Sequence, residues 1–187
     1  MSVQTLESLT GDYTIDTAHS RLGFAARHAM VTKVRGQFNE FEGTAHLDFA
    51  DVSKSFAEVV IKTDSVDTRN EQRNAHLRTN DFFDAPNYPE ITIRSTAVEK
   101  VDDERYRLTG DLTIKETTKP VTIDFEFTGT AVDPFGNVRV GLEGAVTINR
   151  RDWKVEWNAP LEAGGVLVSD KVTLELEVSA IKAKTEG

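Results

Sequence analysis

Apolar and polar residues alternate with a period of two along most of this chain. In the first such run, apolar or small side chains occupy one set of alternate positions, Leu22, Phe24 and Ala26, and His28 continues that set. Arg21 and Arg27 occupy the other set. Similar runs cover residues 57–62, 91–97, 106–114, 121–128, 138–148 and 172–178. Successive side chains of a strand point to opposite faces, so the pattern predicts half-buried strands.

The apolar positions between Gly36 and Phe49 change parity. Phe38 is followed by Phe41, so the apolar set moves from even to odd positions. A slip of one residue turns every later side chain to the other face of a sheet. The sequence therefore predicts a bulge or sharp bend at Asn39 and Glu40.

One segment departs from the alternation. Residues 68–77 are typical of a short polar helix, and the following stretch contains Phe82, Phe83, Tyr88 and two prolines. This stretch is too apolar to lie in water and too rich in Pro, Asn and Asp for a helix or a central strand. We expect a helix and an aromatic plug over one end of a barrel, with Phe82, Phe83 and Tyr88 pointing into it.

Eight long strands with mostly short turns indicate an antiparallel all-β fold with one dry face. A sandwich and an up-and-down barrel both fit this pattern. The barrel is favoured because closure leaves no edge strand exposed. At 187 residues the chain is of a length typical of one domain. We expect the domain to span residues 12–182, with terminal tails at 1–11 and 183–187.

The inside of the predicted barrel is apolar, and small residues recur on its inward faces. An eight-stranded barrel is either filled by its own side chains or holds one small ligand. The small residues favour a void, and the alternative is that they mark places where strands coil closely. The expected lining is Phe24, Phe38, Phe41, Phe49, Ile61, Ile93, Leu112, Phe125, Phe127, Val140, Leu142 and Leu174. An apolar cavity with a polar mouth suits a long-chain amphiphilic lipid.

Composition narrows the remaining classes. The formal net charge of -9 argues against nucleic acid as a partner and gives the chain no overall attraction to anionic membranes. The absence of cysteine excludes disulfides and cysteine-based chemistry. No apolar run is long enough for a membrane-spanning helix, so we expect no integral membrane association. The N-terminus lacks the basic and apolar regions of a signal peptide, which favours a cytoplasmic location.

Few residues carry recognisable chemistry. The four histidines are not spaced as metal ligands, so we expect neither a metal nor another cofactor. His28 ends an inward-facing strand and is a candidate for the ligand-binding rim, or a rim histidine bonded to the backbone. Arg78 and Arg150 lie beside aromatic motifs and are candidates for binding a phosphate head group, with surface ion pairing as the alternative. Trp153 is expected at the end of the barrel, beside the ligand.

Five motifs occur in order along the chain. They are YTIDTAHSRLGFAARH, VRGQFNEFEG, HLRTNDFFDAPNYPEITIRST, GDLTIKETTKPV and INRRDWKV. Together they resemble the YceI-like family of lipocalin-like, polyisoprenoid-binding proteins, over about residues 12–182. The resemblance implies a barrel with a helix and loop insertion that binds a polyprenyl chain inside, with its head group near the mouth, and it implies no catalysis. The chain departs from the family pattern at KETTKP and at RDW, both in turns, and in lacking an export signal.

Three functions are compatible with these features. The leading hypothesis is a non-enzymatic carrier, storage or sequestration protein for a polyisoprenoid or similar long-chain lipid. An enzyme acting on an amphiphile would need a buried acid or base, and the inward face offers His28 and Tyr106. A stress-response module using the outer surface would need an exposed apolar patch. The sequence leaves open whether the chain forms a homodimer.

Overall fold

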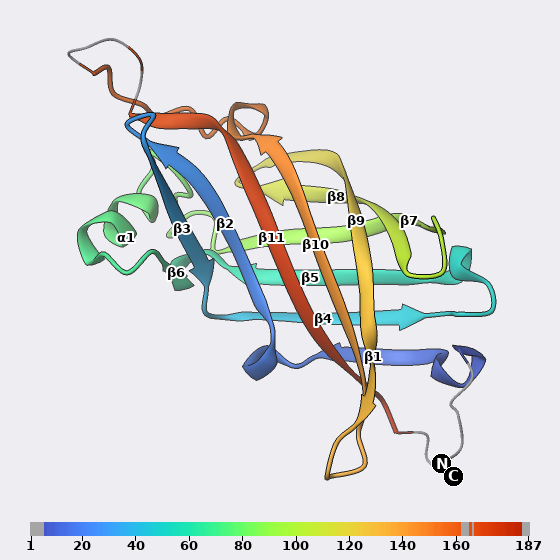
Figure 1. Ribbon diagram of the computed structural model, residues 1–187. Coiled ribbons are helices and arrows are strands. Elements are labelled where there is room, and N and C mark those ends of the chain that lie inside the picture. Colours follow the sequence, from blue (N-terminus) through green and yellow to red (C-terminus); the bar gives the residue numbers. More distant parts are fainter. Residues whose placement is uncertain (1–5, 162–164, 166, 185–187) are drawn as a thin grey trace.

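The structure is a computed structural model that describes residues 6–161, 165 and 167–184, without the side chains of residues 6 and 7. Most of its residues form one antiparallel sheet rolled into a barrel (Figure 1). The strands are β1 (Gly11–Ile15), β2 (Arg21–His28), β3 (Thr32–Phe38), β4 (Phe41–Leu47), β5 (Phe56–Lys62), β6 (Val66–Asp67), β7 (Glu90–Lys100), β8 (Arg105–Ile114), β9 (Thr117–Val132), β10 (Val138–Asn149) and β11 (Val168–Lys182). Of the expected tails, residues 1–5 and 185–187 lie outside the described part.

Eight chain segments make the barrel wall. β1 and β2 are two halves of one bent strand, separated by the 3₁₀ turn η2 (Thr17–His19), and β3 and β4 are the two halves of the next. Neighbouring strands follow the order β1, β4, β5, β7, β8, β9, β10, β11, and β1 pairs again with β11. The predicted eight-stranded antiparallel barrel is therefore confirmed. The predicted bend is confirmed as well, because the chain passes from β3 to β4 at Asn39 and Glu40.

The barrel closes through a short ladder between β1 and β11. Its registered pairs are Tyr13 with Lys182, Thr14 with Ile181 and Ile15 with Ala180. We call this contact the closure seam. Beyond η2 the wall continues, because β2 pairs with the other part of β11.

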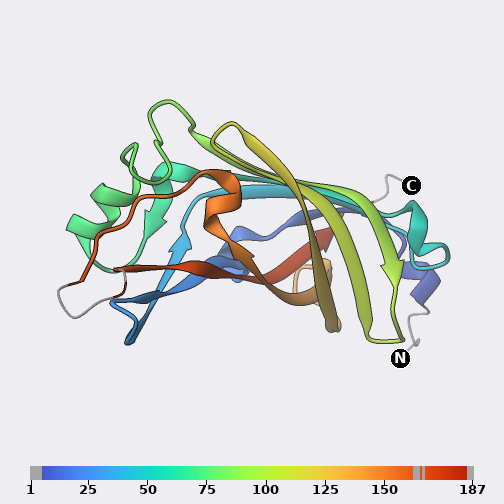
Figure 2. The same cartoon turned by 90° about the horizontal axis from the view of Figure 1, so that it is seen from above.

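Among the described residues there is one α-helix, and it lies at one end of the barrel. α1 (Glu71–Leu77) begins after Asn70, whose side chain accepts a hydrogen bond from the N–H of Arg73 at 3.0 Å. Buried Asn74 accepts from both the N–H and the hydroxyl of Thr68, each at 2.7 Å. These bonds tie α1 to the end of β6, at the end of the barrel where the β2–β3 hairpin projects (Figure 2).

Two of the inward glycines, Gly43 and Gly110, do not border empty space. A Cβ on Gly43 would collide with Cδ1 of Ile15, and one on Gly110 would lie 2.8 Å from the carbonyl oxygen of Arg94. At these positions the alternative interpretation, close approach of the chain, is the correct one. The empty interior is bordered instead by alanines, among them Ala45 and Ala57.

Two further 3₁₀ turns follow strands of the wall. η4 (Thr63–Ser65) links β5 to β6, and η5 (Arg150–Trp153) follows β10. The remaining 3₁₀ turns are η1 (Leu6–Leu9) and η3 (Val52–Lys54). Within the part of the chain that the structure describes, no helix combines the length and apolar character needed to cross a bilayer.

Candidate ligand-binding cavity

The barrel interior contains two apolar chambers in line. The inner chamber, of about 130 Å³, lies toward η3 and the β7–β8 turn, and the outer chamber, of about 140 Å³, lies under α1. Leu22, Ile93 and Leu176 border both chambers. We call these three side chains the waist, because a hydrocarbon chain that fills both chambers must pass them.

The inner chamber is walled almost entirely by apolar groups. Phe49, Tyr106 and Phe125 supply its rings, and burial raises the pKa of the Tyr106 hydroxyl. Asp48 also borders it, but its carboxylate accepts hydrogen bonds from the N–H groups of Ala50 at 2.9 Å and Asp51 at 2.7 Å. The carboxylate therefore shapes the turn before η3.

The outer chamber is covered by the aromatic plug. Phe82 and Phe83 border it together with Leu77 of α1. The ring of Phe83 packs edge-on against Phe38, with centroids 5.7 Å apart, and Phe38 contacts Phe24 at the same separation. The plug is thus held by apolar and aromatic contacts, as predicted for Phe82 and Phe83.

A wider mouth of about 360 Å³ lies outside the plug, between α1 and β2, and has more polar residues in its lining than either chamber has. Ala26, Leu77 and Phe82 border both the mouth and the outer chamber. The basic residues at the mouth are Arg27, His28, Arg73 and His76. None of the described residues that line it is acidic, although the chain as a whole carries a net charge of -9.

His76 and Trp157 form the outer edge of the mouth. The two rings meet edge to face with centroids 4.6 Å apart, and His76 also lies 5.1 Å from Phe82. Nε2 of His76 lies 2.8 Å from Oδ2 of Asp81. Sequence reasoning named neither residue for the site, because Trp157 lies in an irregular segment and reaches α1 only through the fold.

The two arginines proposed for the head group are engaged with the backbone. Arg150 is 5% exposed and borders the outer chamber, and it donates to the carbonyls of Val155 at 2.6 Å and Ser169 at 2.8 Å. Burial lowers its pKa, which Asp170 opposes. Arg78 donates to the carbonyl of Asp64 at 2.9 Å and does not border the cavity. Both hold segments of the mouth end together.

The candidate residues as a whole divide into two groups. Those that border the chambers or the mouth are Phe24, His28, Phe38, Phe49, Ile61, Phe82, Phe83, Ile93, Leu112, Phe125, Leu142, Arg150 and Leu174. Those that the structure places elsewhere are Phe41, Arg78, Tyr88, Phe127, Val140 and Trp153. Their roles in binding stay predictions, but for the second group direct contact with a ligand is not supported by position.

Particular neighbours account for the second group. Phe127 packs against Phe49 at 5.8 Å, behind the chamber wall, and Val140 belongs to a separate buried cluster with Tyr13. Trp153 is buried with its indole N–H donating to the carbonyl of Leu112 at 2.8 Å. Phe41 packs against the main core. Parity identified the inward face correctly but not which inward side chains leave space.

The expectation that Tyr88 points into the barrel is wrong. Its N–H donates to the carbonyl of Asp84 at 2.8 Å, which closes a turn, and its own carbonyl accepts from Thr63 at 2.7 Å. The side chain lies near Glu116, whose charge raises the pKa of the phenol. Asp84, whose carbonyl accepts from Tyr88, has a left-handed backbone with φ of 49° in this turn.

An antiparallel barrel that encloses an apolar interior is the architecture of lipocalin-like barrels. Residues 13–180 match the YceI-like domain, and this chain belongs to that family. A relative, UPF0312 protein VPA0850 of Vibrio parahaemolyticus serotype O3:K6 (strain RIMD 2210633), is 34% identical over 179 residues, covering 95% of this chain and 90% of its own length.

Two solved structures share the fold. The crystal structure of Burkholderia cenocepacia BcnA gives a TM-score of 0.78 at 24% identity and covers 88% of this chain and 98% of its own. A polyisoprenoid-binding domain from Saccharophagus degradans, implicated in plant cell wall breakdown, gives 0.69 at 15% identity, with coverage of 91% and 98%. At these identities the likeness concerns the fold.

Proposed function

We propose that this protein binds a polyisoprenoid or similar long-chain amphiphile and acts as a carrier, storage or sequestration protein. The tail would occupy the outer chamber and extend past the waist into the inner one. The observation that carries the proposal is the continuous apolar lining of the two chambers. The structural neighbour described as a polyisoprenoid-binding domain supports the choice of lipid class.

The energetics of such binding are undemanding. Burial of hydrocarbon contributes about 0.8 kcal/mol per CH₂ group, and micromolar affinity corresponds to about 8 kcal/mol. A tail of a few isoprene units therefore exceeds this requirement even after the costs of association. The number of units that fit depends on whether the waist residues Leu22, Ile93 and Leu176 move apart.

The polar head would lie at the mouth, and an anionic head fits it best. Arg27, His28, Arg73 and His76 surround the space without an acidic residue among the described lining. Arg73 uses its Nε and one terminal nitrogen on Thr68, at 2.8 and 2.7 Å. That arrangement orients the guanidinium and leaves its other terminal nitrogen for a ligand.

Binding is favoured over catalysis because the acids that border the chambers have other partners. Asp48 caps a turn, as described above, and Glu175 is 3.4 Å from Arg21. Burial raises the pKa of Tyr106, which disfavours the ionised phenolate that could act as a base. The expected cytoplasmic location and a homodimer stay predictions.

Native mass spectrometry of freshly purified protein, combined with titration of a fluorescent prenyl probe, tests the proposal. Ala26 borders both the mouth and the outer chamber, so Ala26→Trp should block entry and weaken probe binding by about a hundredfold or more. Ala145→Trp on the exposed face is the matched control and should bind as the parent does. Absence of a copurifying lipid together with failure to bind the probe would reject the proposal.

A further inference from the structure

The tip of the β2–β3 hairpin displays apolar side chains beside the mouth. Met30 is 65% exposed and Val31 is 76% exposed. The hairpin projects at the same end of the barrel as α1 (Figures 1 and 2). β2 also supplies Arg27 and His28 to the lining of the mouth, so the tip and the mouth belong to one surface.

The backbone of this tip is unusual for its residues. Ala29 and Met30 both adopt left-handed conformations, with φ of 52° and 63°. Turns with positive φ at both central residues normally contain Asn or Gly, because a Cβ makes the conformation unfavourable. The turn is held by a hydrogen bond from the N–H of Ala29 to the carbonyl of Leu167 at 2.7 Å. Folding alone does not favour exposed apolar residues in a strained turn, which points to a functional reason.

The hairpin tip itself carries a charge opposite to that of the whole chain. Residues 27–35, RHAMVTKVR, contain Arg27, Lys33 and Arg35 and no acidic residue, in a chain of net charge -9. All three basic side chains are exposed. The nearest part of α1 adds Arg73 and His76 at the mouth, with Glu71 as the acidic residue of the helix.

We propose that this tip docks on the surface of an anionic lipid bilayer. Met30 and Val31 would insert among the head groups, while Arg27, Lys33 and Arg35 face the lipid phosphates. The acidic remainder of the protein would be repelled, so the charge distribution orients the barrel with its mouth toward the bilayer. The inference rests on the proposed function, since docking would allow a hydrophobic ligand to pass between cavity and membrane without crossing water.

The β9–β10 hairpin provides an internal comparison. Its tip exposes Phe135 to 81% and Val132 to 60%, so it is at least as apolar as the β2–β3 tip. Its nearby charges differ, because Asp133 lies in the turn and Arg139 is already paired with Asp133 and Asp16. This hairpin has apolar side chains without an unpaired basic group, and it lies away from α1 (Figure 1).

Sedimentation with sucrose-loaded vesicles tests docking. The parent protein should bind vesicles of phosphatidylcholine with phosphatidylglycerol, should not bind vesicles of phosphatidylcholine alone, and should be released by high salt. Met30→Gly/Val31→Thr and Lys33→Glu/Arg35→Glu should each weaken binding by about tenfold or more. Glycine suits the left-handed backbone at position 30, so the first variant should fold at least as well as the parent. Phe135→Ser should bind as the parent does.

Several outcomes would overturn the proposal. These are no binding to either vesicle, equal binding to both, or an equal loss on Phe135→Ser. If the tip variants kept vesicle binding but lost binding to a protein partner, the surface would be assigned to a protein instead. Titration of the prenyl probe in solution distinguishes failure of membrane docking from failure of the proposed cavity function. Unchanged probe binding without vesicle binding rejects docking alone. Vesicle binding without probe binding rejects the cavity function alone.

Discussion

The closure seam and the mouth hold the barrel together by different means. At the seam the β1–β11 ladder has few pairs, and polar side chains take over where it stops. At the mouth the cover consists of Leu77, Phe82 and Phe83, which pack on apolar neighbours. Hydrogen bonds and ion pairs require one geometry, whereas apolar contacts tolerate sliding. The comparison indicates that the seam requires one geometry, whereas the apolar cover of the mouth tolerates small displacements.

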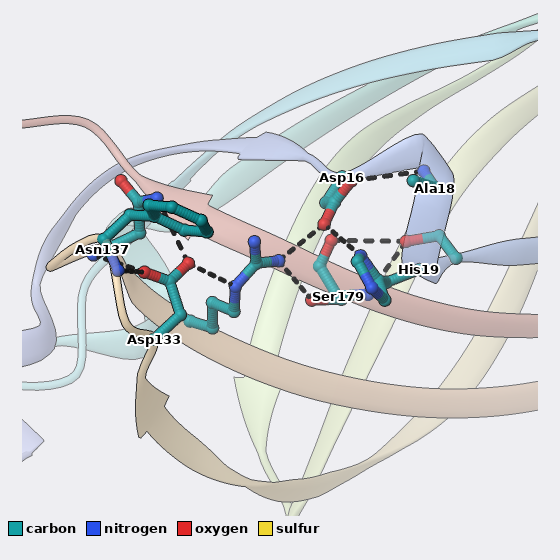
Figure 3. A network of polar contacts seen from close by, with 9 residues as sticks. Asp16, Ala18, His19, Asp133, Asn137 and Ser179 are labelled. Atoms are coloured by element: carbon teal, nitrogen blue, oxygen red, sulfur yellow. Dashed lines mark hydrogen bonds and ion pairs between the residues drawn. The ribbon is translucent and has the colours of Figure 1, made fainter.

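The seam network is drawn in Figure 3. Arg139 binds the carboxylate of Asp16 and, through Nε, that of Asp133 at 2.8 Å. The N–H of Asp16 donates to the carbonyl of Ser179 at 2.8 Å, and the hydroxyl of Ser20 accepts from the N–H of Ser179 at 2.9 Å. These bonds replace the ladder where η2 interrupts the first strand.

The largest effect is expected at a polar anchor of the mouth end. Arg150→Ala would leave the carbonyls of Val155 and Ser169 without their buried donor, which should cost about 3–5 kcal/mol in the free energy of unfolding. Arg151→Ala is the control, since that side chain is half-exposed and paired with Asp170, and should cost less than about 1 kcal/mol. Urea unfolding measures both. Equal losses would show that burial of Arg150 has no special role in holding the mouth end.

A smaller effect is expected beside the seam. The hydroxyl of buried Tyr13 donates to the carbonyl of Leu9 at 2.6 Å, so Tyr13→Phe should cost about 1 kcal/mol. Burial raises the pKa of Tyr13 to about 12. A raised folded-state pKa contributes stability that is present below the ordinary value of 10.0 and is lost as pH rises toward 12. Between these pH values the free energy of unfolding should depend less on pH in Tyr13→Phe than in the parent. An unchanged pH dependence would contradict the assignment of this effect to Tyr13.

The smallest effect is expected from the ion pairs of the seam. Hydrogen bonding from Arg139 lowers the pKa of Asp16. Burial acts to raise the pKa of Asp133, but hydrogen bonds from Asn137 and Arg139 outweigh it and lower that pKa well below its ordinary value. Depressed pKa values contribute stability that is present above the ordinary aspartate value of 3.8 and is lost as pH falls through the folded-state values.

Arg139→Gln should therefore lower Tm by roughly 2 °C at neutral pH and weaken the loss of stability in acid. Thermal unfolding, followed by circular dichroism from neutral pH down into the acid range, provides the measurement. Prenyl-probe affinity should stay the same, because the network lies outside the chambers. A loss of probe binding in this variant would contradict the separation between seam and mouth.

Local pattern was sufficient for the wall of the barrel. The inward assignment of Leu22, Phe24 and Ala26 and the bend at Asn39 followed from a period of two, which backbone geometry imposes on any strand. The role of the glycines did not follow, because a missing side chain can mark either a void or a close neighbour. Only the position of Ile15 opposite Gly43 distinguishes the two.

The site shows the same division. Phe82 and Phe83 could be predicted because an apolar pair in a polar, proline-rich segment must be buried somewhere. Trp157 could not, because its contact with His76 joins segments far apart in the chain. The acceptors of Arg150 could not be predicted either, since the carbonyl of Ser169 becomes its neighbour only when η5 packs against β11.

By itself the sequence determined that this protein has eight long strands, each with one apolar face, since alternation and turn chemistry are properties of neighbouring residues. Only the tertiary structure decided that the interior is divided by Leu22, Ile93 and Leu176, that the mouth is basic, and that Ser20 meets Ser179 at the seam. The physical reason is that register and barrel closure set which distant side chains meet, and neither is encoded in the spacing along one strand.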